Sequence, residues 1–110
     1  MISNGGGVLI QALDLFRQYG LELPELSPST LQRLSAAYPP FYQIHNPIDI
    51  TGSATSADYE IGIETLMRDP QVDIVMAWFV FQAPLLSDDI VQRLARLKRT
   101  YSKPMVLGTI

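Results

Sequence analysis

The chain of 110 residues has the usual size of one domain, and its net charge of −3 and pI near 4.9 make it mildly acidic. This charge argues against nonspecific nucleic-acid binding, which requires a basic surface, and the absence of cysteine excludes disulfides. Because the longest apolar run, 74–81, is too short to cross a bilayer and no charged leader opens the sequence, we expect a cytoplasmic domain with no membrane or nucleic-acid partner.

The first half of the chain predicts a strand end, two helices and one further short strand. Residues 1–3 begin with apolar Met1 and Ile2 and have the pattern of a strand end, and a glycine turn follows. Apolar residues then recur with helical spacing over 8–19, at Leu9, Ala12, Leu13 and Phe16. Residues 21–23 alternate apolar and polar, as a short strand does. Ser27-Pro28 supplies an N-cap and first position for a second helix, which Pro39-Pro40 ends.

The second half continues the alternation of strands and helices. Residues 45–50 are extended, and Thr55 with Asp58 predicts a capping box for a helix that ends at Asp69-Pro70. The nearly continuous apolar run 72–81 predicts a central strand covered on both faces.

A last helix and strand complete the pattern. Ser87 is expected to cap the helix, with Asp88 and Asp89 at its positive end, and 105–107 forms the last strand. Alternating strands and helices with short connections predict an α/β domain, a parallel sheet with helices on both faces and right-handed crossovers. We expect residues 1–110 to form a single domain belonging to a larger multidomain protein, because both ends fall within strands.

The glycine turn is the first candidate site. Asn4, Gly5, Gly6 and Gly7 stand between a strand and a helix, where open α/β sheets bind ligands. Glycines let the backbone approach a ligand closely, and the free N–H groups of a helix start attract phosphate. The alternative is a plain strand-to-helix turn. The turn is neither a Walker loop nor a dinucleotide fingerprint, because no lysine follows and the spacing differs.

The second candidate segment is 46–52. Asp49 lies at the end of an extended stretch beside Thr51 and Gly52, so it could support the anion site or only hydrogen-bond the local backbone. His45, the one histidine, has no partner in a catalytic motif, and we expect neither catalysis nor a metal site there.

Aromatic and basic residues have simple structural explanations. Trp78, Phe79 and Phe81 lie on the expected central strand and favour core packing. The basic residues of the last helix suit a solvated face, although such a face could also contact a partner domain or a nucleotide; they are Arg93, Arg96, Lys98 and Arg99.

Two motifs carry a resemblance to a known family. The first is Asn4-Gly5-Gly6-Gly7 followed by Tyr19-Gly20-Leu21-Glu22-Leu23, and the second is Asn46-Pro47-Ile48-Asp49-Ile50-Thr51-Gly52. Together with the Leu26-Ser27 helix start and Asp69-Pro70-Gln71-Val72-Asp73, they make the chain similar to the NDP-forming (ADP-forming) acetyl-CoA synthetases. These are relatives of succinyl-CoA synthetase, and the similarity covers nearly the whole chain.

The resemblance implies a three-layer, flavodoxin-like ligase domain of the succinyl-CoA synthetase type. The family converts acyl-CoA, NDP and phosphate reversibly to acid, CoA and NTP, with magnesium and through a phosphohistidine. Helices from two ligase-type domains point their N-termini at that phosphohistidine. This chain resembles the domain that supplies a helix and no histidine, so the backbone of Asn4, Gly5, Gly6 and Gly7 would hold the phosphate.

The same resemblance sets expectations for partners and cofactors. CoA, magnesium and ATP or ADP would be used by the parent enzyme, none of them bound by this domain alone. The partners would be CoA-binding, catalytic-histidine and ATP-grasp domains, and the isolated chain would be inactive. Two positions depart from the family: Val8 follows Gly7 where relatives often carry a further glycine, and His45 stands where relatives tend to have a small polar residue.

Two other functions stay open from the sequence. The chain could belong to a non-catalytic relative, such as the synthetase-like half of an acetyltransferase, where it would sense acyl-CoA or nucleotide or form a dimer. It could also be an interaction scaffold whose glycine turn is purely structural.

Overall fold

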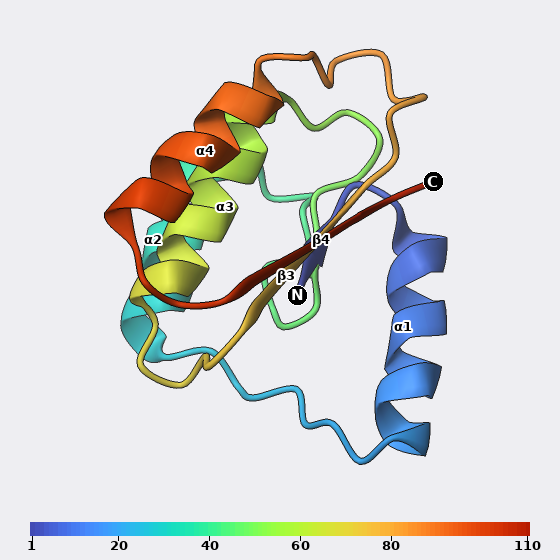
Figure 1. The fold of residues 1–110 in the computed structure, drawn as a ribbon, viewed down its shortest axis with the longest axis vertical. Coiled ribbons are helices and arrows are strands. Elements are labelled where there is room, and N and C mark those ends of the chain that lie inside the picture. The colour runs from blue at the N-terminus through green and yellow to red at the C-terminus, as the bar shows by residue number, and fades with distance from the viewer.

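The computed structural model describes residues 1–110 as one four-stranded sheet with helices on both faces (Figure 1). The elements in chain order are β1 (Ile2–Ser3), α1 (Gly6–Gln18), α2 (Pro28–Ala37), β2 (Ile48–Asp49), α3 (Ser56–Arg68), β3 (Val75–Phe79), α4 (Ile90–Thr100) and β4 (Met105–Thr109). All neighbouring strands are parallel, in the order β2-β1-β3-β4. This order matches the first four strands of the flavodoxin-like arrangement 2-1-3-4-5, so the expected fold is confirmed.

The two faces of the sheet are covered unequally. The helices α2, α3 and α4 lie together on one face, whereas α1 lies alone on the other (Figure 1). The main core fills the three-helix side, where Tyr59, Ile63 and Leu66 of α3 are fully buried. Burial of these large apolar side chains is the principal force that holds the sheet and the three helices together.

Local signals in the sequence fix two of the helix starts. At α3, the Thr55 hydroxyl accepts from the Asp58 N–H at 3.2 Å, and the Thr55 N–H donates to Asp58 Oδ2 at 2.8 Å. At α2, the Ser27 hydroxyl accepts from the Thr30 N–H at 3.3 Å, with Pro28 at the first helical position. Both expected caps are therefore confirmed, and each satisfies N–H groups that the helix itself leaves free.

Three expected elements differ in the structure. Residues 21–23 are irregular, because the segment connects α1 to α2 on the opposite face of the sheet and finds no strand to pair with (Figure 1). The helix α1 begins at Gly6 rather than at Val8. The expected Ser87 cap is wrong, since α4 has Asp89 at its N-cap and the Ser87 hydroxyl instead contacts Asp89 and Ser56.

The strand β3 is central, but only one of its faces is fully covered. Val75, Ala77 and Phe79 are buried against the three-helix side, whereas Met76 and Trp78 on the α1 side are only partly buried. The expectation that both faces are covered is therefore wrong, because α1 alone does not extend over β3 and β4. None of the helices is long and apolar enough to cross a membrane.

Candidate functional site

The site lies at the carboxyl ends of β1, β2 and β3. Because parallel strands end at the same edge of the sheet, the glycine turn after β1, Asp49 at the end of β2, and Val80 after β3 meet there. The strands β2 and β3 lie on the two sides of β1. The helix α1, which follows β1, lies on one face of the sheet, whereas α3, which connects β2 to β3, lies on the other (Figure 1). Such a change of face is a switch point, where open α/β sheets bind ligands.

Asn4 ties the ends of two strands together. It is 4% exposed, its Oδ1 accepts from the Val80 N–H at 2.8 Å, and its Nδ2 donates to the Val80 carbonyl at 3.1 Å. Its backbone N–H donates to the Tyr59 hydroxyl at 2.8 Å, and that hydroxyl lies 2.6 Å from the Trp78 carbonyl, to which it donates. The donors of Asn4 are thus engaged inside the protein, where they anchor the turn.

Gly5 forms the bend that starts α1. Its N–H donates to the Ser3 hydroxyl at 3.0 Å, and its carbonyl accepts from the Val8 N–H at 3.1 Å. A Cβ at this position would lie 2.7 Å from Cγ2 of Val80, closer than side chains approach one another. Glycine at position 5 therefore allows the turn to pack against the end of β3.

The next two amides are the free donors of the turn. The backbone N–H groups of Gly6 and Gly7 make no hydrogen bond within the chain, Gly6 is partly exposed and Gly7 is exposed. No atom lies within 4 Å of the position that a Gly7 Cβ would occupy, so the bend is open to solvent there. Two unpaired N–H groups at the positive end of a 13-residue helix form the environment that anions favour.

Of the second candidate segment, Asp49 is the residue that reaches the turn. A Cβ on Gly6 would lie 2.8 Å from Asp49 Oδ2, so the carboxylate occupies the space beside that glycine. Asp49 Oδ1 accepts from the Thr51 N–H at 2.9 Å, and Thr51 adopts a left-handed backbone with φ of 56°. Gly52 is exposed with open space around it.

Comparison with known proteins places this arrangement in a family. The family described as the Ligase-CoA domain matches residues 1–108. The chain belongs to the Ligase-CoA domain family. It is 34% identical over 77 residues to the alpha subunit of the ADP-forming acetate–CoA ligase II of Pyrococcus furiosus, which covers 70% of this chain and 17% of that protein.

Solved structures give the same relationship. The apo dinucleotide forming acetyl-coenzyme A synthetase 1 of Ca. Korarchaeum cryptofilum superimposes with a TM-score of 0.88 at 28% identity, over 98% of this chain and 24% of that one. The same enzyme in complex with phosphate and ADP gives a TM-score of 0.83 at 30% identity, over 98% and 24%. The chain thus spans less than a quarter of the length of these two relatives.

His45 lies away from the site in this Ligase-CoA domain. It is exposed and precedes β2, so it stands near the amino end of that strand, whereas the glycine turn lies at the carboxyl ends. No group of three or more histidine, cysteine or acidic residues in the chain could hold a metal ion.

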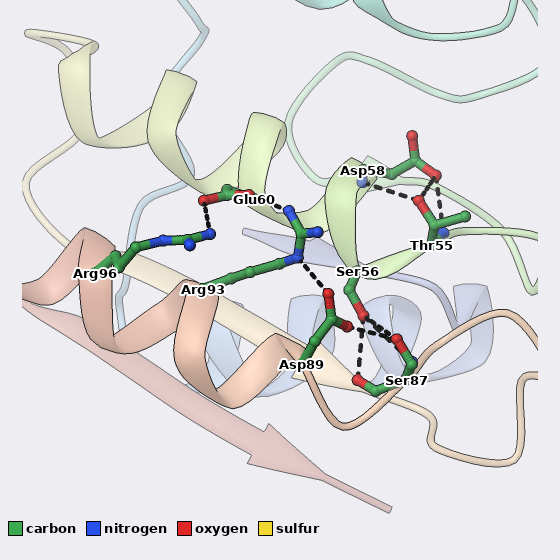
Figure 2. Close-up of polar contacts among 8 residues, drawn as sticks. All are labelled: Thr55, Ser56, Asp58, Glu60, Ser87, Asp89, Arg93 and Arg96. Carbon is green, nitrogen blue, oxygen red and sulfur yellow. Dashed lines mark hydrogen bonds and ion pairs between the residues drawn. The ribbon is translucent and has the colours of Figure 1, made fainter.

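The basic residues of α4 divide into two pairs. Arg93 pairs with Asp89 at 2.7 Å and with Glu60 of α3, and Arg96 pairs with the same Glu60 at 3.0 Å (Figure 2). These bonds lower the pKa of Glu60, although its burial acts in the opposite direction. The two arginines therefore join α4 to α3, whereas Lys98 and Arg99 in the last turn are exposed.

An apolar hollow of about 420 Å³ adjoins the turn on the α1 face of the sheet. It is lined by Gly7, Val8, Gln11, Ala12, Leu15, Trp78 and Ile110. The indole of Trp78 lies against Gly108 of β4, where a Cβ would come within 2.7 Å of the ring, and its buried Nε1 has no hydrogen-bond partner. The Ligase-CoA domain thus leaves an apolar surface uncovered beside its candidate site.

Sequence reasoning found the glycine turn but missed the groups that shape it. Tyr59 has the pattern of a core residue, and nothing in that pattern indicates that its hydroxyl supports Asn4. Glu60, which pairs with Arg93 and Arg96, belongs to no recognisable sequence motif. Their roles depend on how α3 is placed against the sheet and against α4.

Proposed function

We propose that this Ligase-CoA domain faces the phosphoryl group in an NDP-forming acyl-CoA synthetase. The parent enzyme would convert acyl-CoA, NDP and phosphate to acid, CoA and NTP, and another domain would supply the histidine that carries the phosphoryl group. The observation that carries the proposal is the pair of unpaired N–H groups at Gly6 and Gly7, at the N-terminus of α1. Preorganised donors of this kind stabilise negative charge that moves during group transfer.

The relatives support the proposal. They include ADP-forming acetate–CoA ligases, and the enzyme of Ca. Korarchaeum cryptofilum has been solved with phosphate and ADP. In our proposal Gly6 and Gly7 donate to the phosphoryl oxygens. Asn4 and Gly5 hold the turn in place, because their own donors are engaged with Tyr59 and Ser3.

The cofactors and partners in this proposal belong to the parent enzyme. CoA, magnesium and ATP or ADP would be bound by the CoA-binding and ATP-grasp domains, and the phosphorylated histidine would come from a third. The short span of the chain relative to its relatives supports partners of this kind, as does the uncovered apolar surface around Trp78. A phosphate on a separate domain would approach α1 along its axis from the open side of the turn.

The experiment compares two substitutions at one position. Gly6→Pro removes the N–H at the first helical position, where proline is tolerated, and the extended Gly5 (φ −125°, ψ 99°) suits a following proline. Gly6→Ala is the matched control, because it places a Cβ against Asp49 in the same way but keeps the N–H. Both variants are first compared with the wild type in thermal unfolding, so that a loss of fold is recognised.

The readout is the affinity of the 110-residue chain for inorganic phosphate, measured by NMR at constant ionic strength. A charge-assisted hydrogen bond contributes about 1.5–3 kcal/mol, so we expect Gly6→Pro to weaken binding about tenfold or more relative to Gly6→Ala. Equal affinities in two folded variants would show that the Gly6 amide does not bind phosphate.

A further inference from the structure

The anion site of the proposed function already has a negative neighbour. Asp49 Oδ2 lies beside Gly6, within 2.8 Å of where a Cβ would stand, and the first turn of α1 contains no acidic residue of its own. The carboxylate that faces the positive end of α1 therefore comes from β2, a different element.

This carboxylate oxygen has no partner that offsets its charge. Asp49 Oδ1 accepts from the Thr51 N–H, whereas Oδ2 accepts no hydrogen bond, and no arginine or lysine forms an ion pair with Asp49. The Thr51 bond fixes the carboxyl group, so Oδ2 does not turn away from Gly6 without breaking it. Oδ2 is thus an available acceptor at the entrance of the turn.

The distance between Oδ2 and a bound anion has an upper limit. Covalent geometry and a hydrogen bond of ordinary length place an oxygen bound to the Gly6 N–H within about 8 Å of Oδ2, whatever its direction. That is about one Debye length at physiological salt, so the repulsion between the two anions is not screened out.

We propose that Asp49 is a specificity-determining residue of this site, a step that rests on the proposed function. It disfavours an anion that has only acceptor oxygens and favours a phosphoryl group that presents an N–H or O–H donor beside it. Such a donor bonds to Oδ2 while the phosphoryl oxygens bond to Gly6 and Gly7. A phosphoryl group on one nitrogen of an imidazole satisfies both requirements when the other ring nitrogen carries a proton, and a fully ionised nucleotide phosphate satisfies only one.

Two ligands that differ in one donor test the proposal. The probes are methylphosphonate, which has no ring, and (imidazol-4-yl)methylphosphonate, which adds an imidazole N–H. Each is titrated into the wild-type chain and into Asp49→Asn, whose side-chain oxygen still accepts from Thr51. The pH is held well above the second pKa of both phosphonates, so that neither keeps an O–H and only the imidazole ligand has a donor. The matched control is Asp73→Asn, which removes the same charge from an exposed residue at the amino end of β3.

We expect Asp49→Asn to bind methylphosphonate about three- to tenfold more tightly than the wild type, because repulsion at this distance is of that order. The wild type should prefer the imidazole ligand, and Asp49→Asn should lose most of that preference, whereas Asp73→Asn should behave as the wild type. If Asp49→Asn bound methylphosphonate more weakly, or kept the full preference, the proposal would be wrong.

The experiments distinguish a failure of the Asp49 proposal from a failure of the proposed anion site. If Gly6→Pro abolishes phosphonate binding and Asp49→Asn leaves the preference unchanged, the anion site stands and the role of Asp49 is refuted. If neither phosphonate perturbs the Gly6 or Gly7 amides in any variant, the anion site itself is refuted, and this inference is refuted with it.

Discussion

The Tyr59 hydroxyl offers a test of how the turn is held. Tyr59→Phe keeps the ring, which is fully buried and packs against Phe79 with centroids 4.5 Å apart, and removes only the hydroxyl. The buried N–H of Asn4 then has no acceptor, and the Trp78 carbonyl loses its donor. The burial that shields this hydroxyl also raises the pKa of Tyr59, so it stays protonated at any pH at which the protein is studied.

The magnitude follows from those two lost bonds. A buried group left without its partner costs about 1–3 kcal/mol, and relaxation around the smaller side chain recovers part of that. We therefore expect Tyr59→Phe to lower the free energy of unfolding by about 2 kcal/mol, measured by urea denaturation with an unchanged m-value.

Tyr42→Phe is the control for the substitution itself. The Tyr42 hydroxyl makes a single long bond of 3.4 Å to Asp58, so its removal should change the free energy of unfolding by less than about 0.5 kcal/mol. If Tyr59→Phe were no more destabilising than Tyr42→Phe, the hydroxyl would not support Asn4 and the account of the turn would be wrong.

Three further predictions concern the stability of the fold. Hydrogen bonds from the N–H groups of Gln71 and Ser27 lower the pKa of Asp69, against the effect of its burial. The ionised carboxylate therefore stabilises the fold above the pKa that Asp69 has in the unfolded chain, and this stabilisation is lost as the pH falls through the lower pKa of the folded chain. Urea denaturation should show a steeper loss of stability in acid for the wild type than for Asp69→Asn, and parallel curves would refute this. Thr51→Gly should raise the free energy of unfolding or leave it unchanged, because the left-handed backbone of Thr51 costs a β-branched residue about 1–2 kcal/mol; a clear loss of stability would contradict that reasoning. Gly62→Ala should destabilise by about 1–3 kcal/mol, since its Cβ would overlap Ile2 and the Tyr38 hydroxyl; a melting temperature equal to that of the wild type would show that the core tolerates the methyl group.

Much of the fold could be predicted because its signals are local. The capping box at Thr55 and Asp58 and the Ser27-Pro28 start are each readable within four residues, and both are confirmed. Residues 21–23 show the limit, because their alternation suits a strand while strand formation depends on a neighbour. The incomplete cover of β3 could not be predicted for a similar reason, because the composition of that strand does not reveal how far α1 extends across the sheet.

The candidate site could be located but not described from sequence. A glycine run between strand and helix indicates the turn by itself. That Asp49 lies beside Gly6 follows from β2 pairing with β1, a relationship between residues more than 40 positions apart. The inward-facing donors of Asn4 likewise depend on Val80 and Tyr59, which meet it only in the folded chain.

The most direct measurement is the pattern of backbone amide shifts when phosphate is added to the labelled wild-type chain. The account predicts downfield proton shifts at Gly6 and Gly7, with much smaller changes at Asn4 and Gly5, whose N–H groups already donate to Tyr59 and Ser3. Shifts centred instead on the exposed Lys98 and Arg99, with Gly6 and Gly7 unmoved, would contradict it.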